Sequence, residues 1–568
     1  MAPSIRQRHQ SRLESMREER SYYEANWRDY DKYIAPGRLR LNGQRRKGER
    51  NMQDILDETA LLAKRTFQSG MHSGLTSPAR PWMKLRTMDP DMKEFGPVKN
   101  YLYHCEQIIQ HVMRGSNVYN ALHSAYGDLG LFGQSCMLIV GDGPGLRAIP
   151  MMTGQYWIAQ NDKGRVDTLY RQIKMTVEQV VGKFVAKANG DMDWSRASNT
   201  IKALWDQGKY DSWIDICHAV EPRKNRDQSK KTKAHKPFAS NYWEDGQSGD
   251  VMLSEDGFDF NRILAPRYEA EGEDVYGSGH PGEVSLPAVK QLQSEQRMKG
   301  QGIDKIVRPP MQGPSSLRAQ GVSTLPGKIN YIDDPSGRAG LRPVMEVNLR
   351  LGELAADIQD IQHRIDKIWY ADLFFAITQM QGVQPRNVLE LTQRKEEQLL
   401  QLGPVVERQI HEQTNPLVEI VFKTCEEAGL LPEPPTELVE RGEELEIENI
   451  SLLAQAQRAV ATGSIERLVG FAGQILSVKP DVADKLDLDQ AIDEYADAIG
   501  SPSTLIKSDD DVKAMRDERE QQMQAQQQAS MASQMMPAVK DGAQAAHLMS
   551  QTKAADGGEN LLAQLGLS

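Results

Sequence analysis

One stretch of the sequence joins an amphipathic segment to a rigid turn: Ser69-Gly-Met-His-Ser-Gly-Leu-Thr-Ser-Pro-Ala-Arg-Pro-Trp82. The segment before it is predicted to be a helix, because apolar residues recur on one face at Ile55, Leu56, Leu62, Ala63 and Phe67. We expect the two glycines of the stretch to end this helix. The Pro-x-x-Pro that follows predicts a stiff turn that leads onto the tryptophan.

Length and composition limit the classes of protein to consider. With 568 residues the chain exceeds one compact core, so several domains or an elongated subunit of several parts are expected. Hydrophobic residues make up 39% and charged residues 26%, as in an ordinary soluble protein. The net charge of −11 argues against wrapping nucleic acid with a uniformly basic surface. It leaves open a DNA conduit, in which weak contact is preferable.

The cysteines and apolar runs favour a reduced, cytoplasmic setting without a membrane anchor. Cys105, Cys136, Cys217 and Cys425 are far apart and form no CxxC pair, so neither zinc nor a disulfide framework is expected. The most apolar run, residues 129–140, is interrupted by glycines and is shorter than the ~20 residues that cross a bilayer. The Arg-rich N-terminal region lacks the apolar core of a signal peptide.

The first half of the chain is predicted to mix helices and strands. Helices are expected at 4 to about 34, 96–114, 118–132 and 176–188. Strands are expected at 136–140, 145–150, 156–160, 166–173, 212–220, 238–244 and 249–254. Two basic loops, 38–50 and 223–236, are either plain solvated loops or contacts for DNA or an acidic neighbouring subunit.

The second half is predicted to be mainly helical, so the fold class is α+β with helix predominating. A helix at about 285–303 precedes a Pro/Gly-rich piece that runs to Pro343. The next helix, 346–377, would be roughly 48 Å long. Its apolar stripe is Leu351, Leu354, Ile358, Ile361, Ile365 and Ile368, and its opposite face carries Asp357, Asp360, Arg364 and Lys367.

This stripe has two interpretations. The helix is either a core helix of a single subunit or is packed beside a partner helix, from this subunit or another. Its length and charged outer face favour the second interpretation. On the preceding helix, Lys290 and Arg297 are seven residues apart and so share a face. They are either solvated charges or, if the helix lines a channel, weak and sequence-independent contacts to phosphates.

No motif for catalysis, a cofactor or a metal emerges. The Gly141-Asp-Gly-Pro-Gly145 segment fails the G-x-G-x-x-G pattern and is better interpreted as a hairpin turn. No G-x-x-x-x-G-K-[ST] loop, HExxH helix or G-x-S-x-G elbow occurs. The Asp509-Asp510-Asp511 run is more simply the acidic first turn of a helix than a metal cluster. The sequence therefore indicates a protein that is not an enzyme.

Several motifs occur in a characteristic order over about residues 20 to 515. They are Trp27-x-x-Tyr30-x-x-Tyr33-x-x-Pro36, 54–59 with Asp57-x-Thr59, the 69–82 stretch, 166–171, 176–179, 275–281, 450–457 and 487–500. Together they resemble the head-to-tail connector, or portal, proteins of short-tailed (podovirus) bacteriophages. The resemblance implies a homo-oligomeric ring, a dodecamer in this family, at one vertex of the capsid.

The resemblance also implies a division of the chain. It predicts an α+β wing (1–279), a first stem helix (280–303), a small clip (304–345), a second stem helix (346–377), a tunnel loop (378–388), a wing return helix (389–432), a helical crown (433–518) and a Gln/Ala/Met-rich tail that is a frayed helix or disordered (519–568). DNA-channel residues would be Gln379, Gln381, Gln384, Arg386, Lys290 and Arg297. Clip residues for docking would be Pro309, Pro310, Met311, Lys328 and Tyr331.

The implied function is that of the portal vertex: genome packaging, head–tail attachment and DNA ejection. The implied partners are further copies of the chain, double-stranded DNA in the channel, the large terminase that is the packaging ATPase, a tail adaptor, and the major capsid and scaffolding proteins. The protein would be made in the host cytoplasm and reside in the virion. Two other classes stay open, a non-enzymatic scaffold or adaptor of the virion and, less favoured, a DNA-packaging enzyme.

Overall fold

The computed structural model describes most of the first half of the chain and selected parts of the second. The described residues are 4–41, 52, 55–89, 92, 95–143, 145–187, 189–230, 232–246, 250–313, 323, 342–344, 350–379, 401–441, 445–451, 453, 468, 470, 490, 492 and 512–526. Within them, helices and antiparallel sheets are combined, as the predicted α+β class requires.

The largest sheet is an antiparallel meander of five strands in sequence order. Its strands are β4 (Tyr156–Gln160), β5 (Val166–Thr176), β6 (Trp213–Pro222), β7 (Phe238–Glu244) and β8 (Ser254–Phe258). The predicted strands at 156–160 and 238–244 are confirmed, and β5 continues beyond the predicted residue 173. The strand predicted at 249–254 overlaps the observed β8 only at Ser254. Leu253, just before β8, is buried in a hydrophobic cluster, and its N–H donates to the carbonyl of Tyr242 on β7.

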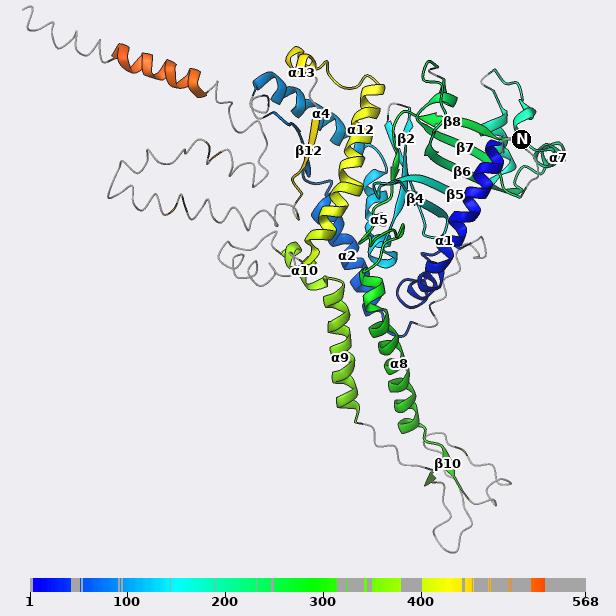
Figure 1. The fold of residues 1–568 in the computed structure, drawn as a ribbon. Helices are drawn as coiled ribbons and strands as arrows, with labels where there is room; N and C mark the ends of the chain where they lie inside the picture. The colour runs from blue at the N-terminus through cyan, green and yellow to red at the C-terminus, as the bar shows by residue number, and fades with distance from the viewer. Residues whose placement is uncertain are drawn as a thin grey trace, which may run out of the picture. The chain divides into compact units, whose positions relative to one another are not determined.

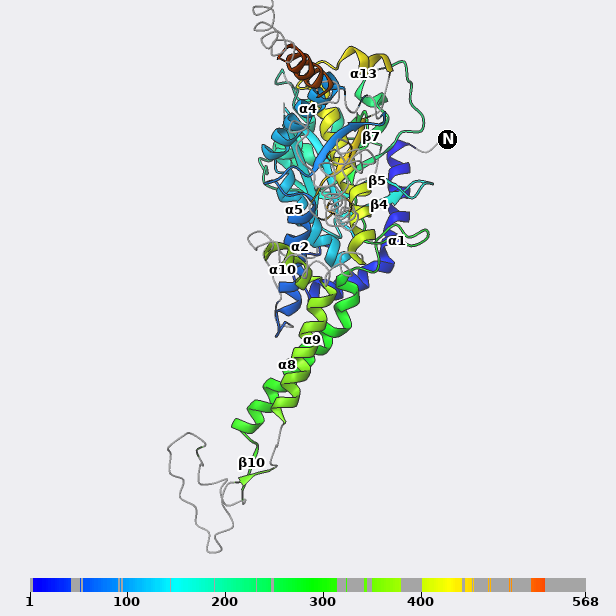
Figure 2. The ribbon, with the colours of Figure 1, turned by 90° about the vertical axis from the view of Figure 1, so that its left-hand side faces the viewer.

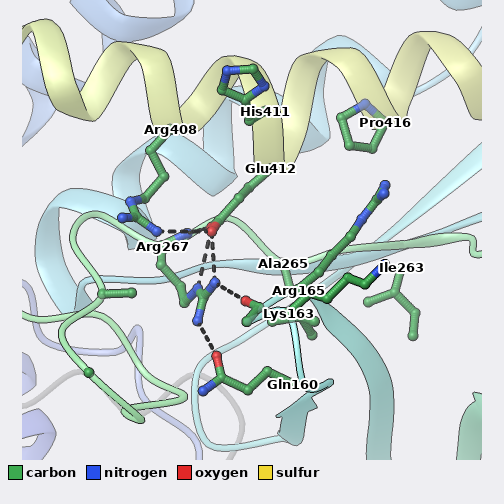
Figure 3. Close-up of a pocket in the computed structure, with 14 residues that line it drawn as sticks. Gln160, Lys163, Arg165, Ile263, Ala265, Arg267, Arg408, His411, Glu412 and Pro416 are labelled. Carbon is green, nitrogen blue, oxygen red and sulfur yellow. Dashed lines mark hydrogen bonds and ion pairs between the residues drawn. The ribbon is translucent and has the colours of Figure 1, made fainter.

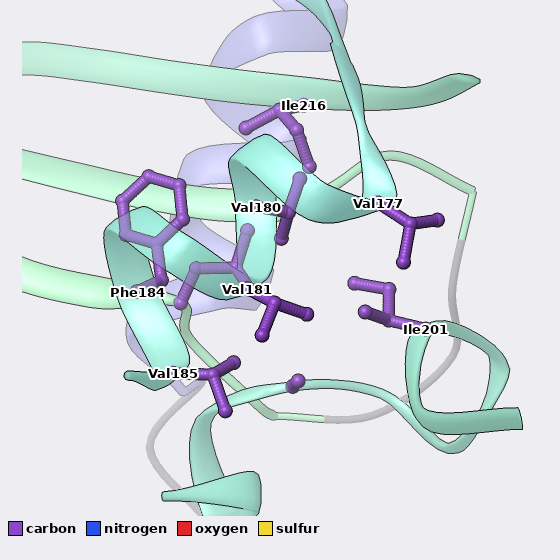
Figure 4. Packing of buried hydrophobic residues seen from close by; sticks show 9 residues of the cluster. Val177, Val180, Val181, Phe184, Val185, Ile201 and Ile216 are labelled. Atoms are coloured by element: carbon purple, nitrogen blue, oxygen red, sulfur yellow. The ribbon is translucent and has the colours of Figure 1, made fainter. Parts of the chain in front are cut away.

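Helical segments pack on both faces of this sheet, and Figure 1 shows α1 running along one of them. Helix α1 (Ile5–Tyr33) begins with a Ser4–Gln7 capping box and packs on one face, where its Leu13 and Met16 join a buried cluster with Cys217 and Ala219 of β6. The adjacent Ile216 points to the opposite face because side chains alternate along a strand. There it packs with α6 (Val177–Val180), the π-helical turn η1 (Val181–Val185) and α7 (Asn199–Asp206), as Figure 4 shows.

A three-stranded sheet and α5 (Val118–Phe132) lie beside the meander. The sheet order is β3-β2-β9, formed by β2 (Cys136–Asp142), β3 (Gly145–Met151) and β9 (Ile263–Leu264). The hairpin predicted at 141–145 is confirmed, since Asp142 pairs with Gly145. All four cysteines are buried and free.

The remaining described elements are mostly helical. They are α2 (Thr59–Leu75), α4 (Gly96–Arg114), α8 (Pro281–Val307), α9 (Leu351–Ile368), α10 (Ala371–Gln379), the helical residues 401–409 with η5 (Ile410–Thr414) and α12 (Asn415–Glu427), α13 (Thr436–Arg441) and 512–526. Two short ribbons pair β1 (Met83–Thr87) with β12 (Leu445–Asn449), and β10 (Met311–Gln312) with β11 (Arg342–Pro343). The 3-10 turns are η2 (Trp194–Arg196) and η3 (Lys233–His235).

The chain divides into two compact units. One comprises Met1–Arg86, Tyr101–Pro434 and Glu444–Gly500, and the other comprises Thr87–Asn100, Pro435–Glu443 and Ser501–Ser568. Both larger sheets and helices α1, α2, α5, α8, α9, α10 and α12 belong to the first unit. Among the described residues, we find no helix whose length and hydrophobicity would let it cross a bilayer.

The two glycines of the 69–82 stretch lie inside α2, so the prediction that they end the helix is wrong. The helix continues to Leu75 and the turn around Pro78 follows, leading to a buried Trp82. The predicted start of this helix is also wrong, because Ile55 and Leu56 precede α2. Leu62 lies in α2 but is exposed, so it is not part of the buried face. Glycine is required at these positions for close packing, and this requirement outweighs its low helix propensity.

Close packing at the glycines creates what we call the aromatic junction, formed by Phe67, Trp369 and Phe374 against Gly70 and Gly130. A Cβ atom on Gly70 would overlap the ring of Phe374, and one on Gly130 of α5 would lie 2.8 Å from Phe67 and 3.0 Å from Trp369. Phe67 meets the other two rings edge to face, with centroids 5.9 Å and 5.8 Å apart. The junction therefore joins α2 and α5 to the α9–α10 segment.

Substitution of Gly70 by Ala tests this junction. Alanine in a helix normally stabilises by about 0.5–1 kcal/mol relative to glycine, but overlap with Phe374 should reverse the sign and cost about 1–3 kcal/mol of unfolding free energy. The matched control is Gly300→Ala in α8, where a Cβ would meet no atom within 4 Å and where we expect mild stabilisation.

Urea unfolding followed by circular dichroism would measure both variants. If the overlap is the cause, Gly70→Ala should cost less in a Phe374→Leu background than in the wild type. Equal stability changes for Gly70→Ala and Gly300→Ala would contradict the close packing.

Candidate functional site: the α8–α9 helix pair

Helices α8 and α9 lie side by side (Figures 1 and 2). Three residues of the predicted stripe, Ile358, Ile361 and Ile365, are buried where α9 packs on α8, and the four charged residues of the opposite face are exposed. The expected partner helix is therefore α8 of the same chain. Helix α9 is about 27 Å long at ~1.5 Å per residue.

The beginning of α8 is fixed by a buried histidine. His280 caps the helix, accepting at Nδ1 from the backbone N–H of Glu283 at 3.2 Å, and Pro281 occupies the first turn. Burial lowers the pKa of His280 to about 3, so its ring is neutral and can accept this bond. A Cβ on Gly282 would overlap the carbonyl oxygen of Leu131, so α8 starts in direct contact with the end of α5.

Asp57 connects the chain before α2 to both helices of the pair, and we call this arrangement the Asp57 clamp. Its Oδ2 accepts from Nε2 of Gln296 on α8 at 2.9 Å and from Nε2 of Gln362 on α9 at 2.8 Å. Gln293 of α8 adds a bond from Nε2 to the Asp57 carbonyl at 2.8 Å and accepts from the Asp57 N–H at 3.0 Å. The carboxylate Oδ1 accepts from the N–H and the hydroxyl of Thr59 at the start of α2.

These hydrogen bonds set the charge state of Asp57. Burial by itself raises the pKa of the carboxyl, but the bonds from Thr59, Gln362 and Gln296 outweigh it and lower the pKa below its usual value. The carboxylate of Asp57 is therefore ionised and accepts hydrogen bonds at both oxygens, and every neighbour named here donates a hydrogen bond to it.

The long helix predicted over 346–377 is interrupted, so that prediction is wrong in its continuity. Helix α9 ends at Ile368 and α10 starts at Ala371. Trp369 is fully buried and donates from Nε1 to Oγ of Ser285 on α8 at 3.0 Å. Tyr370 has φ of 55°, the only positive value among described residues other than glycine. Insertion of Trp369 into the aromatic junction turns the backbone here.

The predicted channel residues are distributed over described and undescribed parts. Lys290 is half exposed on α8, donates to Oδ2 of Asp29 on α1 at 2.6 Å, and lies over the ring of Tyr33. Arg297, two turns further along α8, is exposed. Gln379 is the last residue of α10. Gln381, Gln384 and Arg386 lie outside the described residues, as does the rest of the predicted tunnel loop after residue 379.

Among the predicted clip residues, Pro309, Pro310 and Met311 follow the end of α8, and Met311 pairs with Pro343 in the β10–β11 ribbon. Lys328 and Tyr331 lie outside the described residues. The β10–β11 ribbon extends the antiparallel α8–α9 pair. The start of α8 contacts the residue after α9 through Ser285 and Trp369, and the chain after α8 pairs with the chain before α9 through Met311 and Pro343.

The two basic loops are partly held by local contacts. Arg38 donates from Nη2 to Oδ1 of Asp128 at 2.6 Å, and residues 42–50 lie outside the described part. In the 223–236 loop, Arg223 donates to the carbonyls of Ala234 and Lys236, whereas Lys224 and Arg226 are exposed. Both interpretations of these loops stay predictions.

Sequence reasoning missed the Asp57 clamp. Asp57 and Thr59 were recognisable as a motif, and Gln293 and Gln296 are three residues apart on one helical face, but no pattern assigns a partner to a glutamine. Among the described residues, no group of three or more His, Cys, Asp or Glu side chains could hold a metal ion. The clamp itself anchors α8 and α9 to the chain before α2.

Asp57→Asn tests the clamp. An asparagine must present its amide N–H₂ either to the glutamine donors or to Thr59, so at neutral pH we expect a loss of about 2 kcal/mol of unfolding free energy. Asp360→Asn, on the exposed face of α9, is the matched control and should change little. Hydrogen exchange should become faster in α8 and α9 only for Asp57→Asn.

The clamp also predicts a pH dependence. Because the folded pKa of Asp57 lies below its unfolded value, its stabilisation is complete above the unfolded pKa and is lost as the pH falls through the folded pKa. The stability difference between the wild type and Asp57→Asn should therefore shrink in strongly acidic solution. A difference that does not change with pH would argue against the charged clamp.

Comparison with known proteins identifies the family to which this architecture belongs. The family model described as "Bacteriophage head to tail connecting protein" matches residues 6–506. The portal protein of Salmonella phage epsilon15 is 40% identical over 560 residues, covering 98% of this chain and 97% of the relative. The probable portal protein of Bordetella phage BPP-1 is 39% identical over 527 residues, covering 92% and 93%.

Solved structures add a weaker likeness. A chain of the virion of a native gene transfer agent particle matches with a TM-score of 0.30 and 10% identity, covering 72% of this chain and 92% of that one. A chain from the neck of an empty gene transfer agent particle matches with a TM-score of 0.26 and 10% identity, covering 56% and 70%. At these scores, family membership rests on the sequence. The chain therefore belongs to the family of bacteriophage head to tail connecting proteins, the portal proteins of phage capsids.

Proposed function

We propose that copies of this chain close into a ring, a dodecamer, around a channel for double-stranded DNA at the portal vertex of a capsid. The ring admits the genome during packaging, attaches the tail and releases the DNA at ejection. The observation that carries this proposal is the antiparallel α8–α9 pair, fixed by the Asp57 clamp and the aromatic junction. In a family of connecting proteins, such a pair suits a stem that keeps its position while DNA moves past it.

The division of the chain follows from this assignment. The wing is 1–279, and α8 and α9 lie within the two stem segments, 280–303 and 346–377. The clip is 304–345, the tunnel loop 378–388, the wing return 389–432, the crown 433–518 and the tail 519–568. A wholly helical crown is no part of the proposal, because β12 lies within 433–518.

The DNA contacts are proposed to be weak. Lys290 and Arg297 on α8, with Gln379, Gln381, Gln384 and Arg386, would face the channel. The ion pair between Lys290 and Asp29 already offsets one of these positive charges. Each unpaired cation at a phosphate adds affinity and salt dependence, and a conduit that lets DNA slide needs little of either.

The partners follow from the same assignment. The clip, with Pro309, Pro310, Met311, Lys328 and Tyr331, would dock the large terminase during packaging and the tail adaptor afterwards. The wing and crown would meet the major capsid and scaffolding proteins. The protein would be synthesised in the host cytoplasm and would act in the virion, without catalysis of its own.

Negative-stain imaging of the purified chain, with native mass on the same sample, tests the ring. We expect closed rings with a central hole wide enough for duplex DNA and a mass of twelve subunits. A compact closed dimer would overturn the proposal and favour a virion adaptor instead. DNA-stimulated ATPase activity of the purified protein would favour the packaging enzyme.

Replacing residues 314–341 by a two-residue Gly-Gly turn tests the clip. The β10–β11 pair remains, so rings should form as in the wild type, as checked by native mass. Binding of the purified large terminase in a pull-down should be lost. Undiminished terminase binding would refute the clip assignment and leave the ring intact.

A further inference from the structure

A basic pocket lies between the β4–β5 turn and the helix that contains η5 (Figure 3). Its volume is about 510 Å³. Its charged lining consists of four cations and one carboxylate: Lys163, Arg165, Arg267, Arg408 and Glu412. The pocket therefore has an excess of positive charge on a chain whose net charge is −11.

Inside the pocket, Arg267 and Glu412 form an ion pair whose charges offset each other. Arg267 is buried and donates from Nη2 to Oε1 of Glu412 at 2.7 Å, from Nη1 to Oε1 of Gln160 at 2.8 Å, and from Nη2 to the Gly164 carbonyl at 2.7 Å. Arg408 also donates to Oε1 of Glu412 at 3.2 Å. The single carboxylate of the pocket is thus engaged with two guanidinium groups.

Two cations at the rim remain without a carboxylate among the described residues. Lys163 and Arg165 are exposed, and in Figure 3 their side chains extend away from the Arg267–Glu412 pair. Their backbone is held in place, because the N–H groups of both residues donate to Oδ1 of Asn161 at 3.0 Å. The turn therefore presents two positive charges from a fixed position.

We propose that this basic pocket receives acidic side chains of a second copy of the chain, and that this contact helps to close the ring. The inference rests on the proposed function, which places copies side by side. Charge complementarity supports it, since the chain carries 79 Asp and Glu residues against 68 Lys and Arg residues, so a neighbouring copy has acidic side chains to offer a pocket that is locally positive.

The shape of the pocket favours a protein side chain over DNA. Ile263, Ala265 and Pro416 form apolar walls, which suit the methylene groups of Glu or the flanking residues of an acidic segment. Duplex DNA presents its phosphates on a convex backbone, which does not enter a concavity of about 510 Å³.

Zero-length crosslinking tests the contact directly. A carbodiimide joins the Lys163 amine to a carboxylate only when the two are in contact. Rings assembled from a mixture of ¹⁵N-labelled and unlabelled chains should give mixed-isotope peptides that join Lys163 to an Asp or Glu of another copy. Lys163 crosslinks that are all within one copy, or none at all, would overturn the proposal.

Charge reversal gives a second readout. In Lys163→Glu/Arg165→Glu, we expect half-assembly to require about tenfold more protein, because like charges then face each other. The control, Lys202→Glu/Lys209→Glu, reverses two exposed charges in and just after α7 and should assemble as the wild type does. Unchanged thermal unfolding of the monomer would show that both variants fold.

The two proposals fail in different ways. If wild-type rings form and the Lys163/Arg165 variant assembles equally well, the pocket contact is wrong and the ring stands. If the wild type forms no ring at any concentration, the ring proposal fails and the pocket contact falls with it. Crosslinks from Lys163 to a different virion protein, obtained in whole particles, would assign the pocket to that protein instead.

Discussion

The close approach of aromatic rings to bare backbone at Gly70 and Gly130 is the constraint on which the rest of the structure depends. Without a Cβ at these two positions, Phe374 and Trp369 reach the surfaces of α2 and α5 directly. Trp369 also bonds to Ser285, so the same junction fixes α8. Helix α5 packs on β2 and β3, so the three-stranded sheet is coupled to the α8–α9 pair through side chains that are almost completely buried.

The aromatic junction and the Asp57 clamp contribute in different ways. Burying Trp369, Phe67 and Phe374 supplies a large and non-directional stabilisation, of about 1.5–3 kcal/mol for a side chain the size of Phe. Hydrogen bonds from Gln296 and Gln362 to one carboxylate are directional and are satisfied in one register of the two helices. The junction therefore stabilises the pair, and the clamp selects how far α9 is shifted along α8.

The periodicity of apolar residues was sufficient to predict the main helices and strands. It was insufficient to predict breaks and close contacts that depend on packing between distant parts of the chain. The limits of α4 and α5 agree with the predicted ranges, and the stripe of α9 follows from the spacing of its apolar residues. The break at Tyr370 could not be predicted, because no Gly or Pro lies there. The turn is instead associated with the burial of Trp369, which depends on distant residues. Gly70 and Gly74 were predicted to end the helix, whereas they lie inside it and make room for side chains. Those side chains, Phe374 and Leu453, are hundreds of residues away in the sequence. Asp57 likewise needs partners on two distant helices.

Charge on the helix pair has a consequence for the proposed channel. Lys290 lies within 2.6 Å of an Asp29 oxygen, so a passing phosphate would meet an ion pair rather than an isolated cation. The field of such a pair falls off faster with distance than that of a single charge, and salt screens what remains. Arg297, two turns along, is exposed. If α8 faces the DNA, the ring would therefore attract phosphates at sparse positions along its axis, which favours sliding over tight binding.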